Sequence, residues 1–402
     1  MRHPVSRPRT RALAVGLALT AAALVPTGSA GAADQYQWAA LGDSYTAGGF
    51  VGDPQPALGD ASRDGCDRTT GAYPGLVERE LDEFPPGKPV HLTNVSCGNA
   101  TIANIATAKQ IPISPVQPPA GGWKAVDSQI KRANLNDGTD VVTVGVGGNS
   151  LPFGGMLLKC LELGPKTGKS CREHYTDPPE GEESIQDKLA RIQDEYVEML
   201  AKVHEAAPNA KVITVGYPAV LPDEGSACNR LSLTELGAIK HADIDWLRDN
   251  VLKPLNSTIQ RVSSFFGDRY VDIYSSSVGH DACQSAGTKW VEGICGDAED
   301  YWPTKLAGTA LNCGLINKRV TLVHPNGAGY ANTAAHVERA IRIALLDRTP
   351  NPGAPARDVL RTGALANRAM GVSWRGVGGR PFTRQPSASR GRPLAPGQGY
   401  RH

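Results

Sequence analysis

The fold of this chain is decided by Trp38-Ala39-Ala40-Leu41-Gly42-Asp43-Ser44-Tyr45-Thr46-Ala47-Gly48, an apolar run that stops at a serine in a turn bounded by glycines. A hydroxyl at the carboxyl end of a buried strand, where a helix begins, faces solvent beside backbone N–H groups. Ser44 is therefore a candidate nucleophile. The alternative at this point is an ordinary turn in which Ser44 only caps the helix.

Similar apolar runs follow along the chain, and amphipathic segments lie between them. The predicted strands are 36–41, 90–95, 141–146, 212–217 and 270–273. The main predicted helices are 75–83, 125–135, 185–206, 233–266 with interruptions, and 332–346. Continuous apolar strands that alternate with helices imply a parallel sheet covered on both faces. The sequence thus predicts an α/β fold whose functional crevice lies beyond the carboxyl ends of the strands.

The two ends of the chain differ from its middle. Residues 1–32 begin with arginines, continue with an apolar run and end in small residues, which is typical of a signal peptide. Residues 351–402 carry nine arginines and one acidic residue among Pro, Gly, Ser and Ala, which favours a disordered tail. We expect one domain over 33–350 in a secreted, extracellular protein. The apolar run at 12–25 is shorter than the roughly 20 residues of a transmembrane helix.

Eight cysteines fit an oxidising compartment, and none forms the Cys-x-x-Cys pattern of a zinc or redox site. Structural disulfides are therefore expected at Cys66, Cys97, Cys160, Cys171, Cys228, Cys283, Cys295 and Cys313. Their order suggests the pairs Cys66–Cys97 and Cys160–Cys171, and leaves the pairing of the last four open. Most of these cysteines lie in or near two long stretches, 151–183 and 275–319, which we interpret as disulfide-pinned loops over the carboxyl edge of the sheet.

Polar or glycine-rich residues follow several predicted strands and precede the last helix. They are Gly42-Asp43-Ser44, Ser96-Cys97-Gly98-Asn99, Gly145 to Ser150, and His324-Pro325-Asn326. Ester hydrolysis needs a nucleophile, a base and fixed donors for the oxyanion. Ser44 and His324 supply the first two, and the Ser44 N–H, the Gly98 N–H and the Asn149 side chain supply the donors. No metal ligand set and no nucleic-acid surface is apparent.

With these blocks in order, the chain resembles the SGNH (GDSL-type) hydrolases, and in particular secreted actinobacterial lipases, esterases and phospholipases A1. The resemblance covers roughly 35–346. It implies a three-layer α/β/α sandwich around a central, mainly five-stranded parallel sheet, no metal or other cofactor, and acyl-ester substrates. It also implies the family's defining roles for Ser44, Gly98, Asn149 and His324.

The sequence departs from the family pattern at two positions. The family usually has an aspartate three residues before the catalytic histidine, and Thr321 stands there. We therefore expect a Ser44–His324 dyad in which the Thr321 carbonyl orients the imidazole, as in some relatives of this group, with Asp281 as an alternative remote carboxylate. Ser150 replaces an aspartate that often follows the block's asparagine, which should alter only the surrounding hydrogen bonds.

The reaction centre leaves several functions open. An esterase or lipase, including a phospholipase A1, is the leading prediction, with an ester or lipid substrate and transient contact with a lipid surface. A carbohydrate O-deacetylase would use the same residues, because the motifs do not define the acyl pocket. A non-catalytic secreted binder of lipid or polysaccharide is the alternative from another class. The protein is expected to be a monomer.

Overall fold

The computed structural model describes residues 35–347 and 349 of the 402-residue chain. The predicted signal peptide and the predicted tail lie outside the described residues. The central sheet has five parallel strands in the order β4-β1-β5-β6-β7. They are β1 (Tyr36–Gly42), β4 (Val90–Asn94), β5 (Val141–Gly145), β6 (Lys211–Val215) and β7 (Arg269–Val271). The prediction of a five-stranded parallel sheet is confirmed.

Helices cover both faces of this sheet, and short helical turns lie between some of the elements. The helices are α1 (Ser44–Ala47), α2 (Tyr73–Glu83), α3 (Ile102–Ala106), α4 (Gln129–Arg132), α5 (Phe153–Leu163), α6 (Cys171–Thr176), α7 (Ile185–Ala206), α8 (His241–Leu247), α9 (Lys253–Phe266), α10 (Ile273–Ser277) and α11 (Gly327–Leu346). The turns are η1 (Gly225–Ala227), η2 (Arg248–Leu252) and η3 (Cys313–Ile316). Two small antiparallel pairs, β2 (Pro54–Gln55) with β3 (Arg68–Thr69) and β8 (Cys295–Gly296) with β9 (Arg319–Val320), lie outside the main sheet.

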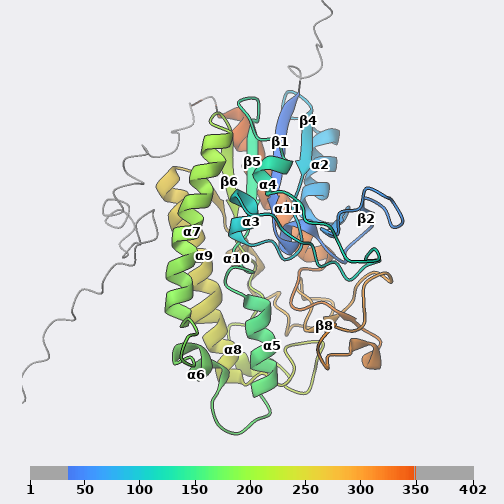
Figure 1. The fold of residues 1–402 in the computed structure, drawn as a ribbon, viewed down its shortest axis with the longest axis vertical. Helices are drawn as coiled ribbons and strands as arrows, with labels where there is room; N and C mark the ends of the chain where they lie inside the picture. Colours follow the sequence, from blue (N-terminus) through green and yellow to red (C-terminus); the bar gives the residue numbers. More distant parts are fainter. Residues whose placement is uncertain (1–34, 348, 350–402) are drawn as a thin grey trace, which may run out of the picture. The chain divides into compact units, whose positions relative to one another are not determined.

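The side chains of β1 explain why the fold has three layers. Successive residues of a strand point to opposite faces. Ala39 and Leu41 accordingly pack in the core that includes α3, α5, α7 and α9. Trp38 and Ala40 pack in the second core, against α2 and α11. Figure 1 shows α7 and α9 side by side on one side of the sheet and α2 on the other. Because both faces are buried, the strand reads as a continuous apolar run.

One part of the sequence interpretation is wrong in detail. The stretch 151–183 is not mainly a loop, because it forms α5 and α6, whose Cys160 and Cys171 are joined by a disulfide. Its two adjacent glycines, Gly154 and Gly155, disfavour a helix, but buried side chains of α5 such as Met156 and Leu157 hold it against the core. The stretch 275–319 is indeed mostly irregular.

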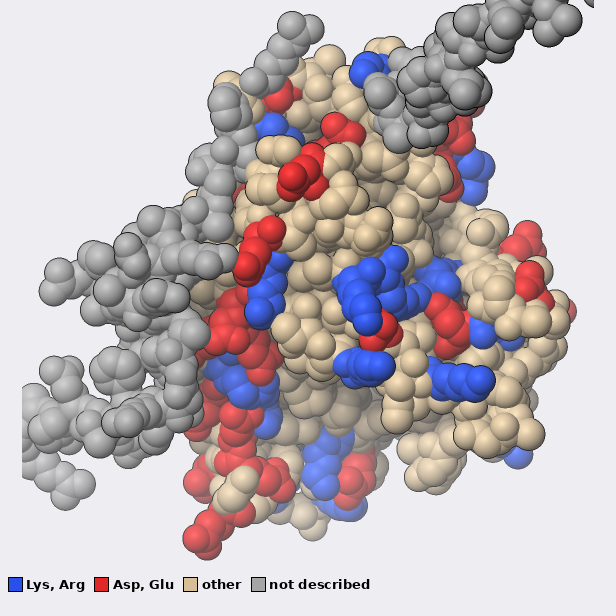
Figure 2. Space-filling model, turned by 45° about the horizontal axis from the view of Figure 1, so that its top comes forward, with Lys and Arg blue, Asp and Glu red and all other residues tan. Residues whose placement is uncertain are grey.

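Disulfides connect segments that lie outside the central sheet. The structure confirms the expected pairs Cys66–Cys97 and Cys160–Cys171, and it joins the remaining cysteines as Cys228–Cys283 and Cys295–Cys313. No helix in the described part of the chain has both the length and the apolar composition that a membrane crossing requires. On the face drawn in Figure 2, acidic side chains form a band along one side and basic side chains gather near the middle.

Candidate active site

The order of the strands brings three site segments together. β1 lies between β4 and β5, so the loops that follow these three strands meet at one edge of the sheet. Ser44 follows β1, Gly98 and Asn99 follow β4, and Asn149 follows β5. All four residues line the same cavity, to which His324 also contributes from the segment before α11.

Ser44 is the first residue of α1 and does not cap it. The cap is Asp43, whose Oδ1 accepts from the Tyr45 N–H at 2.9 Å. The turn requires glycine at position 42, because a Cβ there would lie 2.1 Å from the Thr46 hydroxyl and 2.6 Å from the Gly145 carbonyl oxygen. The capping role that the sequence left open for Ser44 thus belongs to its neighbour. The Ser44 hydroxyl is available to another partner.

That partner is His324. Its Nε2 lies 2.7 Å from the Ser44 Oγ, although the two residues are separated by 280 positions in the chain. Its Nδ1 faces two carbonyl oxygens, at 2.9 Å for Thr321 and 3.0 Å for Leu322. Carbonyl oxygens only accept, so Nδ1 carries the proton and the Nε2 of the neutral ring accepts from the serine. The geometry is that of a nucleophile with its base.

Burial changes the charge state that His324 prefers. It lowers the pKa of the imidazole below its ordinary 6.5, and the carbonyls of Leu322 and Thr321 oppose this by favouring the protonated ring. The neutral base is therefore the resting form at neutral pH. Tyr45 packs against the ring, with the two ring centres 4.7 Å apart, and its hydroxyl donates to the Val323 carbonyl at 2.6 Å.

The backbone before His324 is strained. Leu322 and Val323 have φ angles of +45° and +57°, which branched side chains rarely adopt. The strain persists because the backbone N–H groups of both residues are bonded, to the carbonyls of Ile294 and Gly293 at 3.1 and 2.9 Å. This conformation turns the carbonyls of Thr321 and Leu322 toward the imidazole Nδ1.

Asp281, which the sequence offered as an alternative partner for His324, forms hydrogen bonds with other groups. Asp281 is buried, and its two oxygens accept from the Cys283 N–H at 2.9 Å and the Gln284 side chain at 3.0 Å. Within residues 35–347, the hydrogen-bond partners of the His324 Nδ1 are the carbonyls of Thr321 and Leu322. Ser150, the second departure from the family pattern, accepts from the Ile102 N–H at 3.0 Å.

The donor groups around Ser44 differ in availability. One hydrogen of the Asn149 amide goes to the Ala100 carbonyl at 3.0 Å, which leaves its second hydrogen free to point elsewhere. The Gly98 N–H donates to the Cys66 carbonyl at 2.9 Å. The backbone N–H groups of Ser44 and Asn99 form no hydrogen bond with any of the described residues. Gly98 thus lines the same cavity as Ser44, but its N–H is already hydrogen-bonded to Cys66.

Asn99 stands in one of the polar blocks that follow the predicted strands, but the sequence predicted no role in the site for it. It occupies the third position of a turn closed by the Ala100 N–H and the Cys97 carbonyl at 3.1 Å, with a φ of +62°. Asparagine tolerates this left-handed conformation better than most residues. The pair Gly98-Asn99 was the available signal, since both residue types favour such turns. The turn places Asn99 on the wall of the cavity.

The cavity beside Ser44 is mainly apolar and holds about 300 Å³. Such a volume lies at the lower end of the range for small-molecule sites. Its apolar walls come from several segments and include Phe50, Ile113, Pro115, Phe153, Val220, Leu252, Leu255, Trp302, Pro303 and Leu306. An apolar chain attached to the group that reacts with Ser44 could be buried here.

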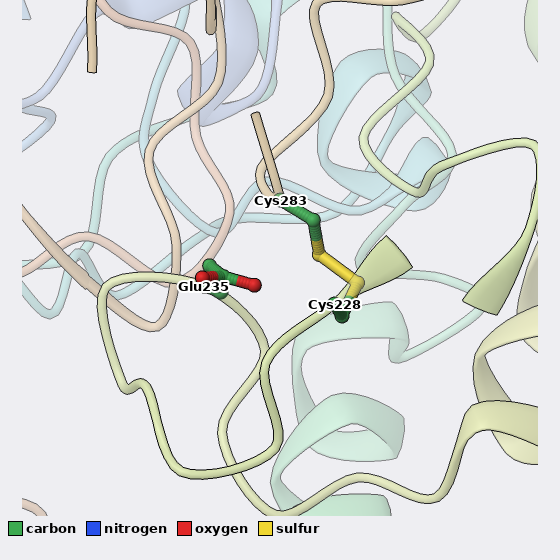
Figure 3. Close-up of side chains that lie close together, drawn as sticks. All are labelled: Cys228, Glu235 and Cys283. Atoms are coloured by element: carbon green, nitrogen blue, oxygen red, sulfur yellow. A yellow bond between two sulfur atoms is a disulfide. The ribbon is translucent and has the colours of Figure 1, made fainter. Parts of the chain in front are cut away.

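Among the described residues, one cluster has the composition of a possible metal site, namely Cys228, Glu235 and Cys283. Figure 3 shows the two sulfurs joined to each other, and the S–S distance is 1.96 Å. The Glu235 carboxylate accepts from the Asn229 N–H at 2.5 Å. A metal would need thiolates, which a disulfide does not provide. The cluster does not fit a metal ion.

Comparisons with known proteins identify the family. Residues 40–331 match the model of the GDSL-like lipase/acylhydrolase family. Lipase 2 of Streptomyces coelicolor is 28% identical over 331 residues, which cover 81% of this chain and 91% of the relative. The esterase of Streptomyces scabiei is 28% identical over 345 residues, covering 81% and 92%. The crystal structure of phospholipase A1 from Streptomyces albidoflavus NA297 is 20% identical, covers 76% of this chain and 99% of that one, and gives a TM-score of 0.48. The chain belongs to the GDSL-like lipase/acylhydrolase family and is an ester hydrolase.

Proposed function

We propose that the protein is a secreted lipase or esterase that hydrolyses carboxylic esters of apolar acyl chains through a Ser44–His324 dyad. The single observation that carries this proposal is the 2.7 Å contact between the Ser44 Oγ and the His324 Nε2 at the edge of an apolar cavity. Four disulfides among the described residues support export, because disulfides persist in oxidising compartments.

The proposed reaction begins when His324 Nε2 takes the Ser44 proton and the serine oxygen attacks the ester carbonyl carbon. The negative charge moves to the carbonyl oxygen, and the imidazolium is stabilised by the carbonyls of Thr321 and Leu322. The tetrahedral intermediate collapses, and the leaving alcohol takes the proton from Nε2. Water then attacks the acyl-enzyme in the same way and releases the acid. A neutral carbonyl takes the place of the usual carboxylate beside the histidine.

For the oxyanion we propose three donors, which are the N–H groups of Ser44 and Asn99 and the side-chain amide of Asn149. All three residues line the cavity. Each of these groups has a hydrogen that forms no hydrogen bond within the described part of the chain. The Gly98 N–H, which the sequence assigned to this role, would first have to give up its bond to the Cys66 carbonyl. Each donor is expected to contribute about 2.7–4 kcal/mol to transition-state stabilisation.

Replacing Ser44 by alanine tests the proposal. The variant should lose turnover of p-nitrophenyl esters and labelling by a fluorophosphonate probe, while its melting temperature stays near that of the wild type. Ser264→Ala is the matched control, because Ser264 is an exposed serine on α9 whose hydroxyl donates to the Gln260 carbonyl. Retained hydrolysis in the Ser44 variant would refute the nucleophile. A wild-type protein that neither turns over esters nor takes up the probe would be a non-catalytic binder.

The cavity also predicts a substrate preference. Its walls are largely apolar, so binding energy should rise with each methylene that they bury, by about 0.8 kcal/mol. A chain-length series of p-nitrophenyl esters should therefore show a higher kcat/KM for octanoate than for acetate, and phosphatidylcholine should be hydrolysed. If acetate and acetylated sugars are the best substrates, the protein is an O-deacetylase instead.

We further propose that the rim of the cavity touches the lipid surface. Ile113 lines the cavity with 63% of its surface exposed, and Ile111, two positions before it, has 67% of its surface exposed. The double variant Ile111→Ser with Ile113→Ser should hydrolyse soluble short esters at close to the wild-type rate but phosphatidylcholine vesicles more slowly. Leu346→Ser is the control, because Leu346 is 70% exposed at the opposite end of α11 from His324. Equal vesicle hydrolysis by all three proteins would refute surface contact.

A further inference from the structure

The hydroxyl of Tyr217 connects the turn that carries Ser44 with the loop that carries Asn149. It donates to the Asp43 Oδ2 at 2.6 Å and accepts from the Gly148 N–H at 2.7 Å. Asp43 immediately precedes the serine, and Gly148 immediately precedes Asn149. The two segments follow β1 and β5, and the phenol that bridges them follows β6.

This chain of hydrogen bonds is shielded from water. Asp43 is 1% exposed and Tyr217 is 5% exposed. Burial raises the pKa of Asp43 to about 7, and it raises the pKa of Tyr217 well above its ordinary value, so the phenol stays protonated. A hydroxyl that donates to a carboxylate becomes a better acceptor, which strengthens its bond to the Gly148 N–H. A buried bond of this kind is also costly to leave unmade.

The Asn149 loop depends on this bond for its place. Gly147 adopts a φ of +138°, and a Cβ on Gly148 would come within 3.3 Å of the Tyr217 ring and hydroxyl. The loop therefore lies directly on the phenol. One end is fixed by the Tyr217 hydroxyl, and the Asn149 side chain is fixed by the Ala100 carbonyl at 3.0 Å. These two attachments restrain both the loop and the direction of the free hydrogen of the Asn149 amide.

Tyr217 is itself held on two sides. The Asn256 side chain of α9 accepts from the Tyr217 N–H at 2.8 Å and donates to its carbonyl at 2.9 Å. Tyr45 meets the Tyr217 ring edge to face, with the ring centres 5.1 Å apart. The phenol oxygen is thus a fixed point between the two loops, and a side chain without that oxygen would keep the packing but lose the connection.

We propose that Tyr217 is a positioning residue that aligns the Asn149 amide with Ser44, and that its hydroxyl is needed for transition-state stabilisation rather than for substrate binding. The inference rests on the proposed serine mechanism. Displacement of a donor by about 1 Å can reduce the rate by roughly 100-fold. Since only the transition state carries the full negative charge on oxygen, a misaligned donor lowers kcat and leaves KM nearly constant.

The test is Tyr217→Phe in the full chain, which removes only the hydroxyl. We expect kcat to fall by about 10- to 100-fold with KM changed by less than about threefold. Tyr196→Phe is the matched control, because Tyr196 is fully buried in the same core and its hydroxyl has no partner among the described residues. The control should keep the wild-type kcat. A Tyr217 variant with wild-type kcat would overturn the proposal.

A double-mutant cycle separates positioning from general damage. If Tyr217 acts through Asn149, Tyr217→Phe should lower kcat by much less in an Asn149→Ala background than in the wild type. Full additivity of the two losses would overturn the proposal. Labelling of each variant at Ser44 by a fluorophosphonate tests the proposed function separately, because it requires the nucleophile and its base. If Tyr217→Phe does not fold, Asp43→Asn breaks the same chain and should show the same non-additivity with Asn149→Ala.

Discussion

The nucleophile and the base are held by two regions of different construction. Ser44, Asn99 and Asn149 follow β1, β4 and β5, which are neighbouring strands of the buried parallel sheet. His324 follows a mostly irregular region whose strands, β8 and β9, have two residues each. A regular ladder of backbone hydrogen bonds between the strands positions Ser44, Asn99 and Asn149. His324 is positioned by a disulfide, a few backbone hydrogen bonds and a strained turn.

This difference implies that the folding of the domain and the alignment of His324 with Ser44 depend on different regions. The sheet carries the two large hydrophobic cores, so a change there alters the stability of the whole domain. The region around His324 has a small core with Cys295, Cys313 and Val320, and it contacts the first large core through Val291 and Val323. Changes in that region should move the base relative to the serine while the sheet remains folded.

The largest effect is expected from removing the base. His324→Ala should lower kcat by roughly 10³-fold or more, because neither proton transfer to nor from the serine is then assisted. The melting temperature should change little, since the sheet does not depend on this side chain. His336→Ala, an exposed histidine on α11, is the control and should retain full activity. Strong unfolding of the His324 variant would show that the two regions are not separate.

The disulfides offer a second comparison. Cys295 follows Ile294, whose carbonyl accepts from the N–H groups of Thr321 and Leu322, both at 3.1 Å. Replacing Cys295 and Cys313 by alanine should therefore lower kcat by about tenfold through misalignment of the base. Replacing Cys160 and Cys171, which join α5 to α6, should leave kcat unchanged.

Both cysteine variants should lose stability, by about 2–5 kcal/mol for each removed disulfide. Urea unfolding measures that loss, and initial rates at low temperature measure kcat on the folded fraction. Equal kcat losses in the two variants would remove the distinction between a disulfide that aligns and one that only stabilises.

The sequence located the elements that depend on local pattern. The predicted strand 141–146 is observed as β5, Val141–Gly145, because branched apolar residues buried on both faces form a continuous run. α5 was missed because the cysteine-containing stretch 151–183 was interpreted as a disulfide-pinned loop, whereas burial against the core decides its conformation. The four motif blocks located Ser44, whereas Asn99 became apparent from the geometry of its turn and Tyr217 from the hydrogen bonds of its hydroxyl. No local pattern states that the Gly98 N–H is bonded to Cys66 or that a phenol joins Asp43 to Gly148.

The pH dependence of activity tests the environment of the base. Burial lowers the pKa of His324, so the ring stays neutral and able to accept a proton at pH values where an exposed histidine is already charged. The acidic limb of kcat/KM should therefore have its midpoint below pH 6.5. Asp43, whose pKa is raised to about 7, is the competing explanation for any limb near neutrality. A limb near pH 7 that disappears in Asp43→Asn would belong to the carboxyl group and not to the base.

The smallest effect is expected at Asp281, the carboxylate that a remote triad would require. Its oxygens accept from Cys283 and Gln284 within its own turn, while the His324 Nδ1 faces the carbonyls of Thr321 and Leu322. Asp281→Asn keeps the shape of the side chain and should change kcat by less than about threefold, whereas loss of a triad carboxylate costs about 10⁴-fold. Steady-state kinetics on a soluble ester measures this change in kcat. A loss of thousands-fold would mean that His324 turns toward a carboxylate during turnover, and that its region is less fixed than the sheet.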